Sequence, residues 1–475
     1  MRRLDHRLYR RTSRRSEATA LGLLRLGRAA DNSLLWVGVA GALAVGGGRF
    51  SRRAALRGLF GAALASGVAN GPVKLLVRRA RPPAGRLAGR FPGFPAPRTS
   101  SFPSGHTAAG IAFAVGAGQE VPALAVPLGA LAALVGYSRV HSGVHYPSDA
   151  LAGAAIGAAA GLATRRLWPV APHEPAEVRT ALTRAEVEPS PTGRGLVVVV
   201  NPSAGSSEKA AEELRKELPD AEVLELDDGQ ELDDALHQAV DSGCAIGVAG
   251  GDGSVNAAAS LAADHDKPLM VIPGGTLNHF AYALGLDSLA DAARAVREGR
   301  AVAVDRALID GHTFVNTASI GSYVDLVDAR ERLEHRIGKW PAVVVALFGV
   351  LRHAEPLDLE LDGERRKVWM VFIGNCRYHP YGFAPSWRER LDDGELDIRI
   401  VHGAQPWSRA RLFASVLTGR LARCGAYEQR FTREMRVKSL DGRLRLARDG
   451  ETFDGPEEFT ICKADQPLLV YVPDA

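Results

Sequence analysis

The chain has 475 residues, of which 46% are hydrophobic and 24% are charged. The length exceeds that of one ordinary domain, and the composition excludes a disordered chain. The formal net charge of +4 is small, and the four cysteines lie far apart with no CxxC pair, which argues against a zinc site or a disulfide framework.

Arginines crowd the first fifteen residues of the chain. Residues 1–32 are therefore predicted to form a basic N-terminal segment, with an interfacial helix over residues 17–30. Such a cluster suits an anionic membrane surface or a cytoplasmic tail. The start does not resemble a signal peptide, because no short apolar core with a cleavage site follows promptly. Nucleic-acid binding is not expected, because no recognition module accompanies the arginines.

Residues 33–167 are dominated by Ala, Gly, Leu and Val, and they contain five apolar stretches. Each stretch is shorter than the roughly 20 residues that span a bilayer. Together, their small residues would permit close helix contact in lipid, so we predict an all-α membrane helix bundle. A soluble all-helical domain is the alternative. The stretches cover residues 34–48, 59–73, 107–119, 121–137 and 150–164.

Prolines interrupt both helices and strands in residues 168–194, which we predict to be a linker. From Leu196 onward, short apolar strands alternate with helical spacing and Gly-rich turns, which is typical of a parallel sheet. A three-layer α/β nucleotide-binding domain is therefore predicted over residues 195–305. Strand follows strand after that point, with one helical interval, so residues 306–475 are predicted to form an antiparallel β-sandwich domain.

Cationic and imidazole side chains lie at the ends of the apolar stretches, where they would converge on one face of the bundle. Lysine and arginine neutralise phosphate oxygens. One histidine can attack phosphorus while another protonates the leaving oxygen, and a carboxylate can fix the tautomer of the attacking imidazole. This set predicts phosphoester hydrolysis without a metal. The residues are Lys74, Arg81, His106, Arg139, His145 and Asp149.

The segments KxxxxxxRP, PSGH and SRxxxxxHxxxD resemble the motifs of the phosphatidic acid phosphatase type 2 family over about residues 30–167. The resemblance implies that His145 is the nucleophile, that Asp149 orients it and that His106 is the general acid. It also implies that Ser104 and the Gly105 amide join the phosphate cradle.

Three other basic residues near these motifs are given no role. Arg78 and Arg79 are interpreted as solvated charges at the membrane interface, and His141 lies outside the motif. Members of this family commonly have six spans, whereas five stretches are present here. A soluble domain related to acid phosphatases or haloperoxidases, which share the His-Arg-Lys set, is the alternative for this half.

Three Gly-rich turns follow successive strands of the second half. Backbone N–H groups at such turns bind phosphate, and glycine lets the chain approach a nucleotide closely. Turns at the ends of successive parallel strands indicate one crevice, in which Asp252 would face Mg²⁺ or the phosphates. Neither GxxxxGK[ST] nor a protein-kinase catalytic loop occurs in the sequence. The turns contain Asn201, Pro202, Ser203, Ala204 and Gly205, then Gly250, Gly251, Asp252, Gly253, Ser254, Val255 and Asn256, and finally Thr276.

This half resembles the diacylglycerol kinase catalytic family, which includes bacterial lipid kinases and the related sphingosine and ceramide kinases, over about residues 195–475. Besides the three turns, the resemblance rests on residues 392–397 (DDGELD) and 449–451 (DGE). It implies that the turns bind ATP, that Glu451 takes the proton from a lipid hydroxyl, and that Asp449 is the near partner of Glu451. Without the turns, Asp-Gly-Glu would be read only as a hairpin.

Two positions concern the magnesium of this family. The resemblance implies a structural Mg²⁺ at Asp393, with help from the backbone of Arg390 and Glu395. Many relatives carry Asp directly after the Asn of the third turn, where this chain has His279. A neutral imidazole cannot replace a carboxylate near Mg²⁺, so the role of that Asp is not carried over.

The two resemblances imply a bifunctional lipid-phosphate enzyme of the cell membrane, with diacylglycerol and phosphatidate as the default lipids. A long-chain base, a polyprenol or another glycerolipid remains an alternative lipid, and homo-oligomerisation is left open. The kinase half is expected to use ATP and Mg²⁺, and the phosphatase half is expected to use no cofactor. A catalytically silent, lipid-binding kinase fold that recruits the phosphatase is the alternative. A multi-pass topology is expected, with the kinase half in the cytoplasm and the phosphatase site on the opposite face.

Overall fold

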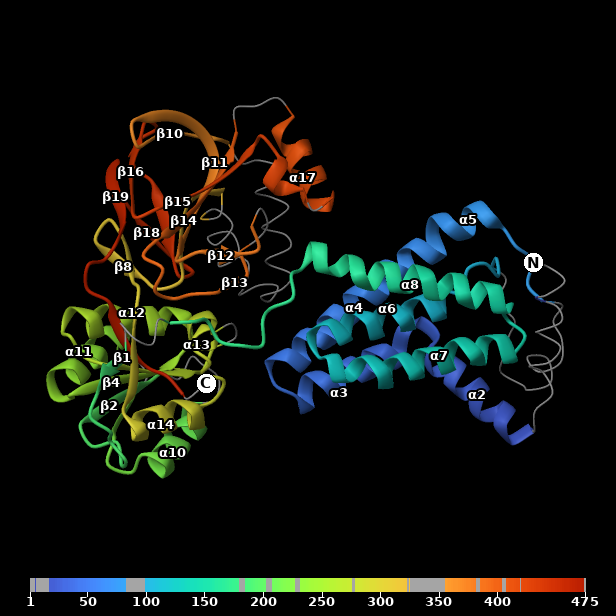
Figure 1. Ribbon diagram of the computed structural model, residues 1–475, viewed down its shortest axis with the longest axis horizontal. Helices are drawn as coiled ribbons and strands as arrows, with labels where there is room; N and C mark the ends of the chain where they lie inside the picture. Colours follow the sequence, from blue (N-terminus) through green and yellow to red (C-terminus); the bar gives the residue numbers. More distant parts are fainter. Residues whose placement is uncertain are drawn as a thin grey trace. The chain divides into compact units, whose positions relative to one another are not determined.

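The computed structural model describes residues 5, 17–82, 99–178, 184–201, 207–226, 231–275, 278–322, 324, 355–381, 385–403, 407–418 and 420–473. The chain divides into two compact units, Met1–Ala171 and Pro172–Ala475. The first unit is built from helices, and the second contains both helices and strands (Figure 1).

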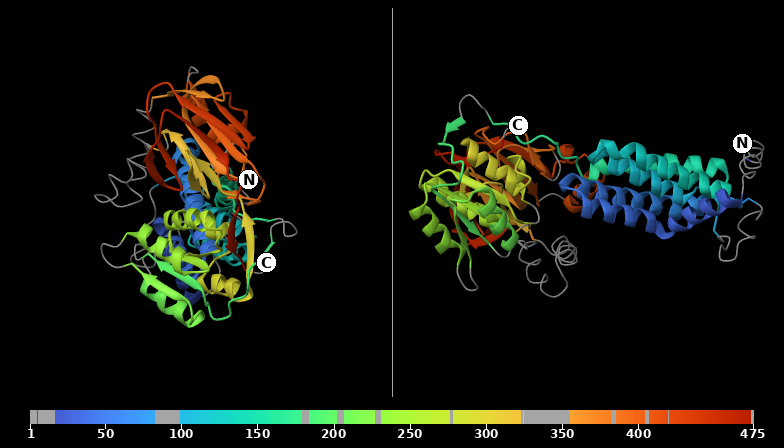
Figure 2. Two further views of the ribbon diagram at one scale, coloured as in Figure 1. Left: turned by 90° about the vertical axis from the view of Figure 1, so that its left-hand side faces the viewer. Right: turned by 90° about the horizontal axis from the view of Figure 1, so that it is seen from below.

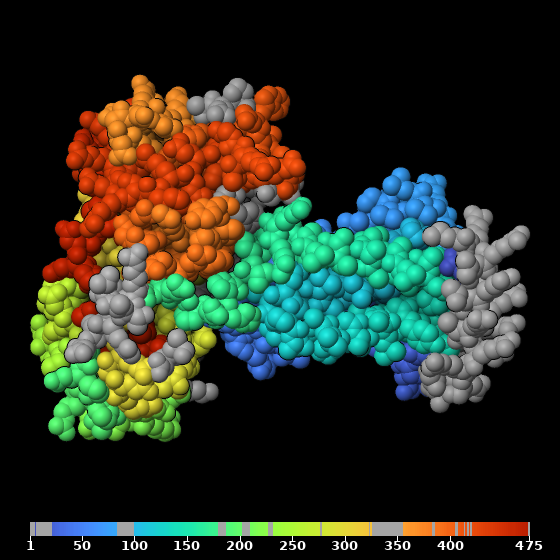
Figure 3. All heavy atoms as spheres, viewed as in Figure 1, coloured from blue at the N-terminus to red at the C-terminus, as the bar shows by residue number. Residues whose placement is uncertain are grey.

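The first unit is a bundle in which helices run side by side (Figures 1 and 2). Helix α6 packs against α4, α7 and α8. On the face shown in the space-filling view, α6, α7 and α8 pack together without a gap (Figure 3). The elements are α2 (Glu17–Ala29), η1 (Asp31–Ser33), α3 (Leu34–Gly46), α4 (Arg49–Val68), η2 (Ala69–Val73), α5 (Lys74–Val77), α6 (Gly105–Glu120), η3 (Pro122–Leu124), α7 (Ala125–His141) and α8 (Pro147–Leu167). The predicted all-α bundle is confirmed.

Small residues let these helices approach closely. A Cβ atom on Gly157 of α8 would lie 2.4 Å from the carbonyl oxygen of Ala108 in α6, so only glycine fits this helix contact. Large side chains fill the remaining interior: the rings of Trp36 and Phe113 are fully buried, with their centroids 5.2 Å apart. The bundle is therefore packed by backbone proximity on one side and by aromatic side chains on another.

Large hydrophobic side chains are exposed on the outside of the bundle, as expected of a surface that faces lipid. They are Leu34, Val37, Val45, Leu56, Phe60, Val68, Leu75, Leu76, Val77, Val126, Leu134, Leu151 and Leu162. Among the described residues, the helical segments Arg49–Val77 and Pro122–His141 are long and apolar enough to cross a membrane. A third would be Leu21–Ala29 with Asp31–Gly46, which together form a helix pair bent by 60°. By length and composition, two helical segments, or three with the bent pair, therefore qualify as spans among the described residues, against the five stretches predicted.

A buried charge cluster fixes one end of the bundle. The side chains of Arg57 and Glu120 are both fully buried and form an ion pair, and Nε of Arg53 lies 2.9 Å from Oε2 of Glu120. Arg57 also donates to the carbonyl oxygens of Trp168 (2.5 Å) and Pro169 (2.9 Å). Both arginines stack on the Trp168 ring. The chain that leaves α8 is therefore bound to the start of α4 and the end of α6.

The first sheet of the second unit has seven strands in the order β1-β6-β20-β5-β4-β2-β3. Strands β3, β2, β4, β5 and β20 run parallel, whereas β6 and β1 are antiparallel additions. Strand β2 is buried along its whole length, as expected inside a parallel sheet. The elements are β1 (Arg184–Glu186), β2 (Leu196–Val200), α10 (Ser207–Glu217), β3 (Glu222–Glu225), α11 (Leu232–Ser242), β4 (Ala245–Gly250), α12 (Asp252–Asp264), β5 (Leu269–Pro273), α13 (His279–Ala283), α14 (Leu289–Glu298), β6 (Arg300–Val304) and β20 (Leu468–Tyr471).

The second sheet has eleven antiparallel strands and its own hydrophobic core, as predicted for a β-sandwich. The path β18-β17-β9-β11-β10-β16-β19-β7-β8 is extended by β14 and β15, which pair beside β11. The elements are β7 (Ala307–Ile309), β8 (His312–Phe314), β9 (Thr317–Gly321), β10 (Leu357–Leu361), β11 (Glu364–Asn375), β12 (Tyr378–His379), β13 (Trp387–Arg388), β14 (Leu396–His402), α17 (Ser408–Thr418), η5 (Leu421–Arg423), β15 (Tyr427–Thr432), β16 (Glu434–Ser439), β17 (Arg445–Arg448), β18 (Glu451–Asp454) and β19 (Glu458–Lys463). Strands β12 and β13 form a separate two-stranded ribbon.

The structure differs from the expected domain bounds in two segments. Strand β20, expected in the β-sandwich, crosses back to lie between β5 and β6 of the first sheet. Its apolar side chains Leu468 and Val470 are fully buried there, which explains the return. Within the expected linker, Arg184–Glu186 forms β1, which covers the free edge of β6. The second half of the linker therefore belongs to the second unit.

Candidate functional site

A pocket of about 210 Å³ opens in the first unit, where many of the predicted phosphate-site residues meet. The predicted residues that line it are Lys74, Arg81, Gly105, His106, Arg139 and His145. The lining is completed by Ala30, Asn32, Ser33, Ser66, Asn70, Thr99 and Ala109. The ionised side chains of this lining are cationic, so the pocket suits an anion.

Neutral oxygens hold two of these cations in place. The Arg81 guanidinium donates to the carbonyl oxygens of Thr99 (2.8 Å) and Val144 (3.0 Å). Lys74 donates to Oδ1 of Asn70 at 2.7 Å. Carbonyl and amide oxygens orient a cation without neutralising its charge. Both side chains are therefore positioned for a phosphate oxygen, which forms stronger charge-assisted hydrogen bonds.

The N-terminus of α6 forms another wall of the pocket. Gly105 lines it, and a Cβ atom there would lie 2.6 Å from Oδ1 of Asn70. Ser104 is fully buried, and its Oγ accepts hydrogen bonds from the backbone N–H and the hydroxyl of Thr107. Ser104 therefore caps the helix, and its predicted contact with phosphate stays a prediction.

The ring of His145 is held in one orientation by the backbone. Its Nδ1 lies 2.6 Å from the carbonyl oxygen of Ser101 and 3.7 Å from Oδ2 of Asp149. Because a carbonyl only accepts, Nδ1 donates the proton, and Nε2 of the neutral ring carries the lone pair. Burial lowers the pKa of His145, and the positive charges of Arg81 and Arg139 lower it further, although Asp149 opposes them. The ring is thus kept in the form that a nucleophile requires.

The other predicted catalytic histidine has a partner that the sequence did not indicate. Nε2 of His106 lies 2.8 Å from Oδ1 of Asp31, and Nη1 of Arg139 lies 3.4 Å from the same oxygen. Asp31 lies at the bend between α2 and α3, where Asn32 and Ser33 both adopt left-handed backbone conformations with φ of 52° and 62°. Such backbone strain is often found at functional sites.

Asp149 is buried behind His145 and is held by both of its oxygens. Oδ2 accepts the backbone N–H of Tyr146 at 2.9 Å, which caps α8. Oδ1 pairs with Nη1 of Arg79 at 2.7 Å. The interpretation of Arg79 as a solvated interface charge was therefore wrong, because its side chain is directed inward to a buried carboxylate. The adjacent Arg78 is exposed.

The Gly-rich turns of the second unit converge at the ends of β2, β4 and β5. Nδ2 of Asn201 donates to Oγ of Ser254 at 2.9 Å, which joins the first turn to the second. A Cβ atom on Gly275 would lie 2.6 Å from the Cα atom of Gly251, so the second and third turns touch. The predicted residues Pro202, Ser203, Ala204, Gly205 and Thr276 lie outside the described residues.

Two carboxylates meet at the N-terminus of α12 in this crevice: Asp252 belongs to α12, and Glu451 comes from β18. Oδ1 of Asp252 is buried and has no hydrogen-bond partner among the described residues. A carboxylate oxygen left free in this way fits a bound Mg²⁺. A Cβ atom on Gly253 would lie 2.4 Å from Oε1 of Glu451, which therefore reaches the helix N-terminus from β18. The buried Asn256 donates to the carbonyl oxygen of Thr313, and Val255 packs in the core.

Asp449 fixes the loop that precedes β9. Its carboxylate accepts the backbone N–H groups of Val315 (2.9 Å), Asn316 (3.0 Å) and Thr317 (2.8 Å). The surrounding protein desolvates this carboxylate and raises its pKa to about 6, assisted by the negative charge of Asp252 and opposed by the three hydrogen bonds. Asp449 is thus a structural partner near Glu451, with its oxygens already occupied.

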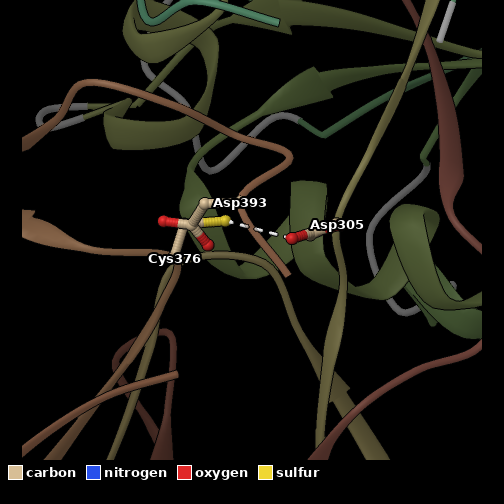
Figure 4. A group of neighbouring side chains, drawn as sticks. All are labelled: Asp305, Cys376 and Asp393. Atoms are coloured by element: carbon tan, nitrogen blue, oxygen red, sulfur yellow. Dashed lines mark hydrogen bonds between the residues drawn. The ribbon is translucent and has the colours of Figure 1, made fainter. Parts of the chain in front are cut away.

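A third group of acidic and thiol side chains lies near the loop before β14. Figure 4 shows the Cys376 thiol directed toward Asp305, with Sγ 3.5 Å from Oδ2, and Asp393 beside it. Nζ of Lys463 lies 2.8 Å from the same Asp305 oxygen and 3.4 Å from Sγ of Cys376. Burial raises the pKa of Cys376 to about 12, so the thiol remains protonated. The Lys463 ammonium therefore supplies the positive charge that faces Asp305.

The predicted structural Mg²⁺ site lies next to this group. The two oxygens of Asp393 accept the backbone N–H groups of Arg377 (2.8 Å) and Glu395 (2.9 Å). The Glu395 carbonyl oxygen accepts the N–H of Cys376, and the Arg390 side chain pairs with Asp392. The oxygens of Asp393 and Glu395 thus offer a metal only their remaining lone pairs. Mg²⁺ binding at Arg390, Asp393 and Glu395 stays a prediction.

Family models match three consecutive parts of the chain. Residues 55–171 match the PAP2 superfamily, and residues 195–309 match the diacylglycerol kinase catalytic domain. Residues 324–463 match the YegS C-terminal NAD kinase beta sandwich-like domain. The order of these matches agrees with the helical unit, the first sheet and the second sheet of the structure.

Individual relatives match the second unit. A diacylglycerol kinase of Bacillus subtilis (strain 168) is 30% identical over 216 residues, which cover 43% of this chain and 70% of that protein. This chain belongs to the diacylglycerol kinase family. A PAP2 domain precedes its kinase part. A diacylglycerol kinase of Staphylococcus carnosus (strain TM300) is 26% identical over 240 residues, which cover 48% of this chain and 76% of that protein.

Solved structures resemble each unit. A diacylglycerol kinase from Bacillus anthracis str. Sterne has 19% sequence identity and a TM-score of 0.42, covering 59% of this chain and 97% of that chain. A PAP2-type phosphatidylglycerolphosphate phosphatase from Bacillus subtilis has 20% identity and a TM-score of 0.28, covering 34% of this chain and 82% of that chain. The first unit is called the PAP2 unit below, and the second is called the kinase unit.

Some residues of the PAP2 site could not be predicted from the motifs. Asp31, Asn70 and Arg79 contact the predicted residues through hydrogen bonds or ion pairs. Asp31 and Asn70 lie in or beside apolar stretches of the sequence and outside the motifs. The sequence indicated only that a polar side chain in such a stretch requires a hydrogen-bond or ion-pair partner. Arg79 lies 70 positions before Asp149, so sequence spacing gave no indication of their pairing.

Proposed function

We propose that this protein is a bifunctional lipid-phosphate enzyme. The PAP2 unit hydrolyses a lipid phosphomonoester without a metal, and the kinase unit transfers a phosphoryl group from Mg·ATP to a lipid hydroxyl. Phosphatidate and diacylglycerol are the default substrates, since the chain matches the PAP2 superfamily and the diacylglycerol kinase catalytic domain, and a diacylglycerol kinase is 30% identical over 216 residues.

In the PAP2 unit, Nε2 of His145 attacks phosphorus, forming a P–N bond while the P–O bond to the lipid breaks. His106 gives its proton to the departing lipid oxygen. Lys74, Arg81 and Arg139 neutralise the charge on the phosphoryl oxygens as the transition state forms. The observation that supports this assignment is the Nδ1–H bond from His145 to the Ser101 carbonyl, which leaves Nε2 free to attack.

The second half of the reaction frees the enzyme. Water attacks the phosphohistidine, the P–N bond breaks, and inorganic phosphate leaves. His106, now neutral, takes the proton from the attacking water, which returns it to its starting form. Burial and the charge of Arg139 lower the pKa of His106 to about 4, and the hydrogen bond with Asp31 opposes them. The negative charge of a bound phosphate would also favour the protonated imidazole that the first half requires. No net proton is gained or lost by the histidines over the cycle.

In the kinase unit, Glu451 takes the proton of the lipid hydroxyl while the hydroxyl oxygen attacks the γ-phosphorus of ATP. The P–O bond to ADP breaks as the new ester bond forms. The observation that supports this role is the contact between Glu451 and Gly253 at the N-terminus of α12, where backbone N–H groups would hold the ATP phosphates. Positioning and charge neutralisation supply most of the rate enhancement in such transfers.

Asp252 and Asp449 have different tasks in this proposal. Bound Mg²⁺ would neutralise the phosphate charge, and the free Oδ1 of Asp252 is the oxygen that would hold it. Asp449 keeps the loop at residues 315–317 in place through three N–H bonds. His279 begins α13 and is exposed, and it takes no part in holding the metal.

The experiment that tests both activities uses full-length protein, total membrane lipid and γ-³²P-labelled ATP. Thin-layer chromatography should show label entering a lipid that co-migrates with phosphatidate. In the absence of ATP, inorganic phosphate should be released from added phosphatidate when EDTA is present. A PAP2 unit that needs a divalent metal, or a kinase unit that labels no lipid, would contradict the corresponding half of the proposal. The latter result would favour a silent lipid-binding kinase fold.

A further inference from the structure

Arg79 lies between two carboxylates at the edge of the PAP2 site. Its Nη1 lies 2.7 Å from Oδ1 of Asp149, and its Nη2 lies 2.7 Å from Oδ2 of Asp5. Ser148 joins the same group, because it accepts from Nη1 of Arg79 and donates to Oδ2 of Asp5, each at 2.7 Å. The guanidinium also lies over the Tyr146 ring, 4.2 Å from its centroid. These contacts hold Nη1, Nη2 and one face of the Arg79 guanidinium.

The two oxygens of Asp149 face different partners. Oδ1 faces Arg79, whereas Oδ2 accepts from the Tyr146 backbone and lies 3.7 Å from Nδ1 of His145. Arg79 can therefore prevent the carboxylate from rotating without competing for the oxygen that faces His145. Asp5 contributes in turn, since it is buried and its own contacts hold the far edge of the guanidinium.

We propose that Arg79 and Asp5 are positioning residues of the phosphatase reaction: Arg79 fixes the Asp149 carboxylate behind His145, and Asp5 fixes Arg79. The inference rests on the proposed phosphatase function. It gives Asp5, which precedes the residues matched by the PAP2 superfamily, a contact with the proposed catalytic machinery. Asp5 lines neither cavity of the site, whereas Arg79 is absent from the lining of the 210 Å³ pocket but lines an adjoining cavity of about 610 Å³. A positioning role for Arg79 therefore predicts a loss of kcat, and a substrate contact predicts a rise in KM.

The charges alternate in sign along the series His145, Asp149, Arg79 and Asp5. Removing the charge of Arg79 or of Asp5 should therefore shift the pH dependence of His145 in opposite directions. His145 faces Asp149 on α8, Arg81 after α5, Arg139 on α7 and His106 on α6. Loss of the Arg79 charge leaves Asp149 less compensated, so the cationic form of His145 becomes more favourable. Loss of the Asp5 charge has the opposite effect, because Arg79 then compensates Asp149 more fully. A residue that only supports the fold would not produce shifts of opposite sign.

The experiment measures phosphate release from phosphatidate in mixed micelles by the full-length protein, as kcat and KM across pH. For Arg79→Gln we expect kcat to fall about 10- to 100-fold with KM nearly unchanged, less than the roughly 10⁴-fold typical when a triad carboxylate itself is neutralised. The acid limb of kcat/KM should move to higher pH in Arg79→Gln and to lower pH in Asp5→Asn. Each shift should be about 0.5 to 1 unit, below the 1–3 units typical of a directly adjacent charge.

Two further variants sharpen the test. Arg79→Lys keeps the charge and should restore the acid limb to its original position, with part of the turnover. Arg78→Gln removes the neighbouring exposed charge and should leave both kcat and the limb unchanged. If Arg79→Gln does not fold, Asp5→Asn and Arg79→Lys still decide the matter through the position of the limb.

The inference would be overturned if Arg79→Gln and Asp5→Asn moved the limb in the same direction or left it in place. It would also be overturned if Arg79→Gln raised KM alone, since Arg79 would then bind the substrate. Failure of the proposed function looks different, because His145→Ala would then retain phosphate release, whatever the Arg79 variants do.

Discussion

Oε1 of Glu451 lies so close to Gly253 that a Cβ atom at this glycine would be 2.4 Å away from it. The two residues come from different sheets of the kinase unit: Gly253 follows β4 of the parallel sheet, and Glu451 begins β18 of the antiparallel sheet. The contact therefore brings the candidate base to the turn at which the phosphates of ATP are expected. It also ties the two sheets together at the point where chemistry is proposed.

The first prediction concerns the candidate base. Glu451→Gln keeps the size of the side chain but removes its ability to accept a proton, so phosphoryl transfer should fall by about 10² to 10⁴. ATP binding should persist, because the Gly-rich turns remain intact. Labelled-lipid formation and nucleotide binding by calorimetry measure the two quantities. The exposed Glu457 provides a matched control, and Glu457→Gln should retain full activity. Full activity in Glu451→Gln, together with a dead Asp449→Asn, would show that the base is the other carboxylate.

The second prediction uses the glycine itself. Gly253→Ala places a methyl group where Oε1 of Glu451 now lies, so this exposed and flexible side chain must rotate away. We expect kcat for lipid phosphorylation to fall at least tenfold, while the free energy of unfolding changes by less than about 1 kcal/mol, because alanine is favourable in a helix. Urea unfolding followed by activity assays separates the two effects. Unchanged kcat would mean that Glu451 is not needed at this position.

The third prediction concerns the pH dependence of the kinase. The pKa of Asp449 is raised from 3.8 to about 6 in the folded protein. Its contribution to stability is therefore fully present below about pH 3.8 and is lost as the pH rises through about 6. Ionised Asp449 accepts three N–H bonds that hold residues 315–317, so kcat/KM should rise with pH through about 6 with the slope of a single proton. Asp449→Asn should remove this limb and lower the activity at every pH. A limb that survives in Asp449→Asn belongs to another group.

The fourth prediction tests the nucleophile of the PAP2 unit. His145→Ala should abolish phosphate release, whereas lipid phosphorylation should stay within a few-fold, because the active residues of the kinase lie in a separate unit. In the unmodified protein, activity should fall as the pH drops through the lowered pKa of His145, below its ordinary 6.5. His141, which stacks on Tyr137 at the end of α7, is the matched control, and His141→Gln should retain turnover. Undiminished phosphate release in His145→Ala would exclude this residue as the nucleophile.

Motif spacing predicted the pocket residues because antiparallel helices return the chain to the same end of a bundle. Lys74 lies near the end of one helix, His106 near the start of the next, and Arg139 near the end of the helix after that. Residues at alternate helix ends must then lie close together, so Lys74, His106, Arg139 and His145 all line one pocket. The turns at the ends of β2, β4 and β5 lie together because the carboxyl ends of parallel strands share one edge of the sheet.

The contacts that the sequence did not reveal are those between residues far apart in the chain and outside any motif. Arg79 could be solvated or paired, and only the fold brings it to Asp149. Asp31 lies in a bend between helices, and nothing in its neighbourhood of the sequence indicates His106 as its partner. The last strand had the apolar pattern of either sheet, and burial between β5 and β6 decided its place.

The fifth prediction concerns the two faces of the membrane. The first turn of helix α8 contains Asp149, near the pocket. Trp168 follows the last residue of the helix, and its carbonyl oxygen is bound by Arg57 in the buried charge cluster. Helix α8 is not among the helices that qualify as spans by length and composition. If it nevertheless spans, the pocket and the kinase unit lie on opposite faces, and the kinase unit, for which we propose ATP as the phosphoryl donor, is cytoplasmic. Charge bias partly supports this arrangement, because Arg165 and Arg166 lie in the last turn of α8.

Charge bias also partly opposes it. Asp5, whose neighbours in the sequence are rich in arginine, contacts Arg79 and Ser148 at the pocket end, on the face predicted to be non-cytoplasmic. Cysteine-accessibility labelling resolves this conflict. In a background without the four native cysteines, Ala88→Cys should react with a membrane-impermeant maleimide in intact cells. Glu174→Cys, at an exposed position after α8, should react only after permeabilisation. Reaction of both probes in intact cells, or of neither, would place both sites on one side and show that α8 does not cross the bilayer. A reversed pattern would put the pocket in the cytoplasm and the kinase unit outside, which is incompatible with the proposed use of ATP in the cell.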